Sequence, residues 1–312
     1  MADLIRQITL RQMRALAEVA RSRNVTEAAR RLGLTQPAVT LQLKNLEDLA
    51  GLPILQRTAD GMETTQAGAA LLRLHDRVEA ALGDCANALD MLKGLTGGRV
   101  SIGAVSTAKY FAPFVIAEFA RQHPAIELKL TIGNREEVIQ GLRDYSLDLA
   151  ISGRPPADLD LERRLIGDHP HVVIGPAHHP LADSAHVDLR VLAQETFIIR
   201  EEGSGTRILM ENLFREAGLV PRIGMEISSN ETIKQAVMAG LGVAFISAHT
   251  VAGEVEDRRL AILPVDGLPL VRQWYVVRRA DKALLPPAQA LMDFLGAEAG
   301  KFLPVVPGCP HA

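Results

Sequence analysis

Five side chains near the start of this 312-residue sequence have the types and spacing that reading a DNA duplex requires. They are Gln36, Pro37, Thr40, Leu41 and Lys44, and a helix would present them on one side. Amide and hydroxyl groups hydrogen-bond base edges directly or through water, apolar side chains contact thymine methyl groups, and a lysine contacts phosphate or guanine. The alternative is that these residues form an ordinary solvated helix face. The pattern of the neighbouring elements distinguishes the two interpretations.

Those neighbouring elements follow the pattern of a helix-turn-helix. Apolar spacing predicts a first helix over residues 10–20, with Thr9 as its cap. A second helix begins with Thr26 as N-cap and ends at Gly33, which supplies a left-handed residue. Thr35 caps a third helix. The buried stripe of that helix is predicted to be Val39, Leu43, Leu46 and Ala50, so the five polar and apolar residues above face outward.

Basic residues around the third helix are expected to contact phosphates. Arg30 and Arg31 lie on the second helix, and Arg57 lies in a predicted β-ribbon, or wing, over residues 52–65 with an Asp60-Gly61 turn. Residues 1–60 hold nine Lys/Arg and six Asp/Glu, a local charge of +3, whereas the whole chain carries −3. This excess is small, so we expect dimerisation to double the DNA-contacting surface.

A long helix is predicted from Gln66 to Leu95. Its apolar positions step by three and four residues in a heptad-like seam, which is typical of a dimerisation helix. The alternative is a core helix of a larger domain. Gly97-Gly98 ends the helix and marks a domain boundary.

Beyond residue 98, strand-like and helix-like segments alternate in two similar sets, which predicts an α/β fold with parallel sheets covered by helices. A late strand (271–278) and a final helix (286–299) could return to the first set, leaving a cleft between two lobes. The predicted domains are 1–65 (winged helix-turn-helix), 66–96 (linker helix), 97–170 with 268–300 (lobe I), 171–267 (lobe II) and an irregular or frayed tail, 301–312.

Polar residues follow the strands of both lobes, where ligands of α/β proteins bind. We expect an anionic effector at Ser106, Thr107, Lys109, Asn134 and Arg154 in lobe I, and at Ser204, Thr206, Arg207, Ser229 and Asn230 in lobe II. Simple helix capping by the same hydroxyl and amide groups is the alternative. Convergence of five such loops on one cleft favours a ligand site.

Several classes of activity lack their motifs in this sequence. The segment Glu202–Arg207 is neither G-x-x-x-x-G-K-S/T nor G-x-G-x-x-G, and no G-x-S-x-G nucleophile elbow exists, so no catalytic residues are predicted. Histidines at 169, 171, 178, 179 and 186 lie in a proline-broken segment without zinc-site spacing, which favours a surface loop or lobe crossover over a metal site. Two cysteines build no disulfide framework. No membrane span or secretion signal is recognisable, so the cytoplasm is the expected compartment.

The whole chain resembles the LysR-type transcriptional regulators. The resemblance lies in T-E-A-A-R-R-L-G-L-T-Q-P-A-V-T-L-Q-L-K-N-L-E (26–47), in T-T-Q-A-G (64–68) and in the long helix. Within the family, the chain is similar to activators of Calvin-cycle (RuBisCO) operons. That similarity is carried by S-T-A-K-Y-F-A-P (106–113), G-N-R-E (133–136), G-R-P-P (153–156), H-P-H-V (169–172), E-G-S-G-T-R (202–207) and S-N-E-T-I-K-Q-A-V-M-A-G (229–240).

The resemblance implies a homotetramer, a dimer of dimers, that binds an inverted-repeat operator and acts with RNA polymerase. It also implies a two-lobed effector domain of the periplasmic-binding-protein-like (type 2) fold. The effector would be a sugar phosphate or a reduced nicotinamide nucleotide such as NADPH, with no other cofactor, and the targets carbon-fixation genes. A LysR-type regulator of another metabolic operon, with a different organic anion, is the alternative. A transported-solute receptor would need a secretion signal and no helix-turn-helix, and a metabolic enzyme would need a catalytic constellation.

Overall fold

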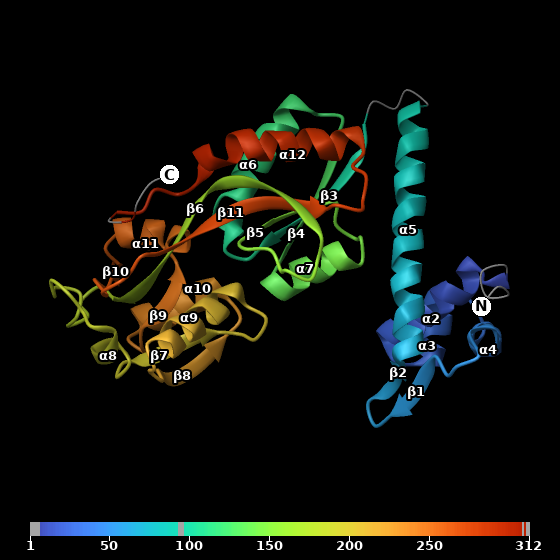
Figure 1. Cartoon of the computed structure of the whole chain (residues 1–312), viewed down its shortest axis with the longest axis horizontal. Helices are drawn as coiled ribbons and strands as arrows, with labels where there is room; N and C mark the ends of the chain where they lie inside the picture. The colour runs from blue at the N-terminus through green and yellow to red at the C-terminus, as the bar shows by residue number, and fades with distance from the viewer. Residues whose placement is uncertain (1–6, 93–96, 308, 310–312) are drawn as a thin grey trace. The chain divides into compact units, whose positions relative to one another are not determined.

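The computed structural model describes residues 7–92, 97–307 and 309. The chain divides into two compact units, Met1–Ala86 and Asn87–Ala312 (Figure 1). The first unit is helical with one small β-ribbon, and the second is an α/β unit with two lobes. No helix in the described ranges is long and apolar enough to cross a membrane.

The first unit is a winged helix-turn-helix, as predicted. Its helices are α2 (Leu10–Ser22), α3 (Val25–Leu32) and α4 (Gln36–Ala50). The wing is an antiparallel pair of strands, β1 (Leu55–Thr58) and β2 (Gly61–Thr64).

Local capping chemistry sets the helix boundaries, and one predicted cap is wrong. Thr9 forms a capping box with Gln12, Thr35 accepts from the N–H of Ala38, and Gly33 is left-handed (φ 65°), all as expected. The N-cap of α3 is Asn24 and not Thr26. The Asn24 side-chain oxygen accepts from the backbone N–H groups of residues 26 and 27, at 2.8 and 3.1 Å, because a residue in extended conformation just before the helix can reach both.

The core of this unit is built from the inner faces of the three helices. Val39, Leu43 and Leu46 are buried, as predicted, whereas Ala50 is half-buried at the end of α4. They pack with Leu16 and Val19 of α2, with Ala28 and Ala29 of α3, and with Ile54 and Leu71 from beyond the turn. The outer face of α4 is therefore left to solvent.

The long helix α5 spans Gln66–Leu92, and the predicted last turn falls in residues 93–96, outside the described part of the chain. Leu71 anchors its first turns in the winged-helix core. Further along the predicted seam, Leu74, Leu82 and Leu89 are 40%, 44% and 50% exposed. A single chain thus leaves the seam uncovered.

Lobe I of the second unit surrounds parallel strands. Its strands are β3 (Arg99–Val105), β4 (Glu127–Gly133) and β5 (Leu149–Ser152), and its helices are α6 (Ala112–Gln122), α7 (Arg135–Arg143) and α12 (Pro286–Glu298). β3 pairs in parallel with both β4 and β5. α6 and α12 lie on one side of this sheet and α7 on the other (Figure 1). The buried side chains between these layers form one continuous core.

Lobe II repeats the alternation on a smaller scale. Its elements are β7 (Thr196–Arg200), α9 (Gly205–Glu216), β8 (Arg222–Ile227), α10 (Asn230–Met238), β9 (Ala244–Ser247) and β10 (Leu260–Ile262). β7 and β8 pair in parallel, as predicted. Shorter helical turns are η1 (Ala108–Tyr110), α8 (Leu189–Leu192), η2 (Ala248–Thr250), α11 (Ala252–Glu256) and η3 (Ala299–Phe302).

Two antiparallel strands cross between the lobes, and one of them was not predicted. β6 (Leu161–Pro176) pairs with β11 (Leu270–Arg279) from Leu161 to His171, and its later residues pair with β9 and β10. The prediction of a surface loop at the first histidines is wrong, because His169 and His171 are buried within β6; the other predicted possibility, a lobe crossover, is confirmed. Groups of side chains able to hold a metal ion are absent from the described residues.

The tail is irregular after η3, as predicted, but its described part is not frayed. Val306 and Cys309 are buried in the core of lobe II.

Gly68 is predicted to be essential for the junction between the wing and α5. A Cβ there would lie 2.0 Å from the carbonyl oxygen of Ile54, a backbone atom that cannot move aside. Gly68→Ala should therefore destabilise the first unit by about 1–3 kcal/mol. Gly83→Ala in the same helix meets open space and should be neutral or stabilising by up to about 1 kcal/mol. Hydrogen exchange of peptides from residues 10–76 in the full chain measures both, and equal protection in the two variants would contradict the steric argument.

Candidate functional site

The outward face of α4 carries the five predicted DNA contacts together. Gln36, Pro37, Thr40, Leu41 and Lys44 are all exposed. Leu41 is 55% exposed, at the centre of these polar neighbours. An apolar side chain between polar ones is what a thymine methyl group and neighbouring base edges would meet.

Two hydroxyl groups restrict how this face can hydrogen-bond. The Thr26 hydroxyl donates to the Gln36 side-chain oxygen at 3.2 Å and so orients the amide. The Thr40 hydroxyl donates to the backbone oxygen of Gln36 at 3.0 Å. Because that donation uses its only proton, Thr40 can offer a base only an acceptor or its methyl group.

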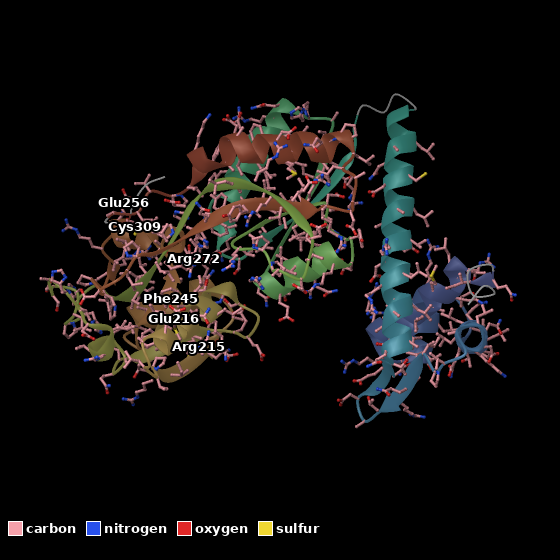
Figure 2. The ribbon with its side chains drawn as sticks, in the orientation of Figure 1. Arg215, Glu216, Phe245, Glu256, Arg272 and Cys309 are labelled. Atoms are coloured by element: carbon pink, nitrogen blue, oxygen red, sulfur yellow. The ribbon has the colours of Figure 1, made fainter. Side chains whose placement is uncertain are left out.

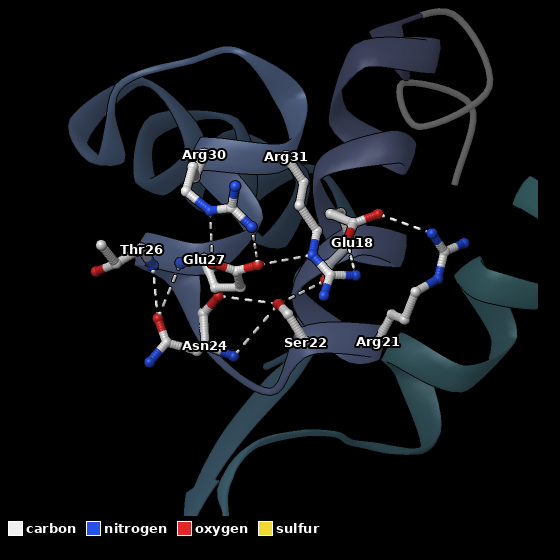
Figure 3. Close-up of polar contacts among 8 residues, drawn as sticks. All are labelled: Glu18, Arg21, Ser22, Asn24, Thr26, Glu27, Arg30 and Arg31. Atoms are coloured by element: carbon white, nitrogen blue, oxygen red, sulfur yellow. Dashed lines mark hydrogen bonds and ion pairs between the residues drawn. The ribbon is translucent and has the colours of Figure 1, made fainter.

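The predicted phosphate contacts on α3 are already engaged in an ion-pair network (Figure 3). Glu27 receives two hydrogen bonds from Arg30, at 2.9 and 2.6 Å, and one from Arg31 at 2.8 Å. These hydrogen bonds lower the pKa of Glu27 to about 2. Arg31 also reaches Glu18, which pairs with Arg21. Each arginine therefore has part of its guanidinium occupied, and Arg57, exposed on β1, lies outside this network.

The second unit contains a cavity of about 430 Å³ lined by both lobes. Six of the ten predicted effector residues line it: Ser106, Thr107, Asn134 and Arg154 from lobe I, and Ser204 and Thr206 from lobe II. Asn134 caps α7 by a hydrogen bond to the N–H of Glu137, and Ser204 precedes α9 without capping it. The start of α9 thus lines the cavity through Ser204, Gly205 and Thr206, and the two hydroxyl-bearing residues are buried there.

The four other predicted residues lie outside the cavity lining. Lys109 pairs with Glu231 at 3.3 Å, joining lobe I to lobe II. Arg207 pairs with Glu211 and Glu226. Ser229 caps α10, and Asn230 is buried and accepts a hydrogen bond from Arg200.

Sequence reasoning missed seven polar residues of the cavity, namely Arg135, Ser152, His169, His171, Arg200, Asn212 and Arg272. Arg200 ends the buried run of β7, and a charge directly after such a run was an available signal. The histidines and Arg272 lie on the two crossing strands; Arg272 projects from β11 near lobe II (Figure 2). Their pairing joins residues about a hundred positions apart, which a local pattern does not show.

The charge of the lining is uniform. Four arginines (135, 154, 200 and 272) line the cavity, and the described lining includes neither aspartate nor glutamate. Arg200 is 3% exposed. It donates two hydrogen bonds to Glu201, at 2.7 and 2.8 Å, and one across the lobes to the Ser106 hydroxyl, at 3.2 Å. A site of this kind attracts an anion with several acceptor oxygens.

Comparison with known proteins finds a DNA-binding family at the helix-turn-helix and a ligand-binding family at the unit that contains the cavity. Residues 10–69 match the bacterial regulatory helix-turn-helix protein, lysR family, and residues 93–300 match the LysR substrate binding domain. The chain belongs to the LysR family. It is 53% identical to the HTH-type transcriptional regulator CbbR of Xanthobacter flavus, over 96% of this chain and 91% of the relative. It is 42% identical to the RuBisCO operon transcriptional regulator of Allochromatium vinosum, over 94% and 97%.

Solved structures show the same LysR architecture. The regulatory domain of Synechocystis CcmR, solved in complex with 2-PG, is 38% identical with a TM-score of 0.62 and covers 64% of this chain and 96% of its own. Full-length CbnR with its target DNA is 22% identical with a TM-score of 0.65, covering 94% and 100%, and so supports the fold. This LysR regulator is a sequence-specific DNA-binding transcription factor and not an enzyme.

Lys44 is expected to contribute to DNA binding by charge. Lys44→Ala should weaken operator binding and reduce the slope of log affinity against log salt by about one, because one fewer phosphate contact releases fewer counterions. Lys129→Ala, which removes the same charge from β4 in the other unit, is the control. Fluorescence anisotropy across a salt series measures both. An unchanged salt slope for Lys44→Ala would remove this lysine from the interface.

Proposed function

We propose that this LysR regulator controls carbon-fixation (Calvin-cycle) genes in response to a small phosphorylated organic acid bound between its lobes. The observation that carries the proposal is the arginine-lined cavity free of described carboxylates. Its relatives named as CbbR and as a RuBisCO operon regulator support the choice of target genes.

The size and charge of the cavity favour a compact anion. A volume of about 430 Å³ lies at the smaller end of ligand sites. The 2-PG bound to the CcmR regulatory domain has this chemistry, a phosphate and a carboxylate on a short chain. A reduced nicotinamide nucleotide such as NADPH remains the larger candidate from the sequence, and it would need the lobes to separate. A regulator of another operon would bind a different organic anion.

The uncovered seam of α5 supports a dimer. Leu74, Leu82 and Leu89 lie seven or eight residues apart and are substantially exposed in the single chain. Pairing two such helices would bury them, and pairing of dimers would give the tetramer implied by the sequence. Two winged-helix units would then bind the two halves of an inverted repeat.

Signal transmission would act through the closure of the two lobes. An anion that contacts Ser106 and Asn134 in lobe I and Ser204 in lobe II binds the closed form better than an open one, and so shifts the population. Through α5, the closed form would set the spacing of the recognition helices on a bent operator.

The compartment for this activity is the one that contains bacterial DNA, the cytoplasm.

Arg272 provides a direct test of the ligand class. Arg272→Gln should weaken 2-PG binding by about ten- to a hundredfold, because a hydrogen bond to a charged group contributes ~1.5–3 kcal/mol. Arg222→Gln, an exposed arginine on β8 outside the cavity, should bind normally. Titration calorimetry with 2-PG, NADPH and a sugar phosphate measures each. Binding of NADPH alone, or of none of them, would reject the phosphorylated acid.

Footprinting tests the coupling to DNA. The footprint on a carbon-fixation promoter and the bend angle should change when 2-PG saturates the wild-type protein, and the change should be lost at the same concentration in Arg272→Gln. Identical footprints with every ligand that binds would contradict the mechanism.

A further inference from the structure

One wall of the cavity differs from the arginine-lined remainder. It consists of Ser152 at the end of β5 and of His169 and His171 on β6, here called the imidazole wall. These three side chains are 1%, 5% and 1% exposed. Burying an imidazole is less favourable than burying an apolar side chain of similar size, so these histidines point to a role beyond packing.

We propose that the imidazole wall binds an anionic group of the effector and that the histidine pair takes up a proton as the ligand enters. The inference rests on the anionic ligand class proposed above. It assigns to these residues a recognition role that extends beyond the arginines.

Ser152 offers an unused hydrogen-bonding group at the imidazole wall. Its hydroxyl oxygen is one of two buried side-chain atoms that lack a hydrogen-bond partner among the described residues. A buried hydroxyl without a partner is destabilising, by ~1–3 kcal/mol in typical cases. Since Ser152 lines the cavity, a ligand oxygen would supply the partner.

The two histidines are held in fixed positions by their neighbours. His169 Nε2 lies 2.9 Å from the Ser247 hydroxyl, and its ring stacks on Trp274 with centroids 3.7 Å apart. His171 Nδ1 donates to the backbone oxygen of His169 at 3.1 Å, which leaves Nε2 as its basic nitrogen. On the cavity side, His169 Nδ1 lies 4.0 Å from where a Cβ of Gly153 would stand.

Burial explains why the histidine pair is neutral when no ligand is bound, and neighbouring positive charges such as Arg272 act in the same direction. β11 contributes Arg272, β7 contributes Arg200, α7 contributes Arg135 and the loop after β5 contributes Arg154, all on the cavity lining. Burial lowers the pKa of His169 well below its usual value, and burial lowers the pKa of His171 to about 4. His249 on η2 also faces the pair, but its Nδ1 accepts the Trp274 N–H at 3.1 Å and so cannot carry a proton there.

An anion reverses this balance. A phosphate or carboxylate beside the pair would offset the repulsion from the arginines and favour an imidazolium. The same cation would be stabilised on the face of Trp274, an arrangement that attracts positive charge. Between the depressed pKa of the empty protein and the raised pKa of the complex, binding takes up a proton. Affinity should therefore increase as the pH falls through this window, and should level off near pH 4.

Titration calorimetry of the wild-type protein with 2-PG tests the proposal without any substitution. At pH 7 to 7.5, the binding heat should vary linearly with the ionisation enthalpy of the buffer, with a slope of up to about one proton taken up. Affinity should fall by up to about tenfold per pH unit for one linked proton. The emission of Trp274, the only tryptophan in the chain, should change with ligand and follow the same pH profile.

Variants identify the group that takes the proton. His169→Gln and His171→Asn keep hydrogen-bonding atoms near Ser247 and the His169 backbone but cannot be protonated, so the double variant should bind 2-PG more weakly and without proton uptake. His178→Gln, an exposed histidine outside the cavity, should behave as wild type.

The possible outcomes separate the two proposals. Binding without any dependence on buffer overturns the proton linkage and leaves the phosphorylated acid as effector. Uptake that persists in the double variant also overturns it, since the phosphate itself, with a second pKa near 6, would then be the acceptor. Absence of 2-PG binding overturns the ligand class and this inference together.

Discussion

The hydrogen bonds of the buried Arg200 guanidinium are the interactions on which the second unit, which contains the effector cavity, depends. It is held at the end of β7 by two hydrogen bonds to Glu201 and one of 2.6 Å to Asn230. A buried charge is tolerated only when its partners are in place, so these contacts fix the start of α10 relative to β7. The remaining contact, with Ser106 at 3.2 Å, crosses to lobe I. The same arginine is therefore part of the core, of the lobe contact and of the cavity.

A second group of contacts holds the lobes together beside the cavity. Tyr110 and Lys109 of lobe I both bind Glu231 of lobe II. Burial alone would raise the pKa of Glu231, but hydrogen bonds from Tyr110 and Lys234 outweigh it and lower the pKa to about 2. This carboxylate is therefore charged throughout the physiological range. The contact between the lobes thus has two components. The ion pair at Glu231 is always charged, whereas Arg200, which lines the cavity, can bind an anionic ligand as well as Ser106.

Local sequence signals were sufficient for the elements but not for how distant elements come together. Helix caps, the Gly33 turn, the wing and the α/β alternation depend on neighbouring residues, and most were predicted to within a residue or two. The missed strand β6 carries His-Pro-His in its middle, and its apolar face is recognisable only once β11 and β9 lie beside it. The four arginines of the cavity come from α7, the loop after β5, β7 and β11, so their convergence is a property of the topology. The Thr26 cap was wrong because Asn24, two residues earlier, already accepts from the N–H groups of residues 26 and 27 and so begins the helix at Val25.

The first unit is a weakly charged DNA reader, and this affects how the effector can act. In the network of Figure 3, the arginines 21, 30 and 31 form ion pairs with Glu18 and Glu27. Three positive and two negative charges leave a net charge of +1. A single such unit gains little from phosphates. In the proposed dimer, once one winged-helix unit is bound to DNA, the winged-helix unit of the other chain binds intramolecularly. Its effective concentration depends on how well the distance between the two winged-helix units matches the spacing of the operator halves. A ligand that alters only this span would change DNA affinity without touching either reading surface, so weak individual contacts make the regulator sensitive to its effector.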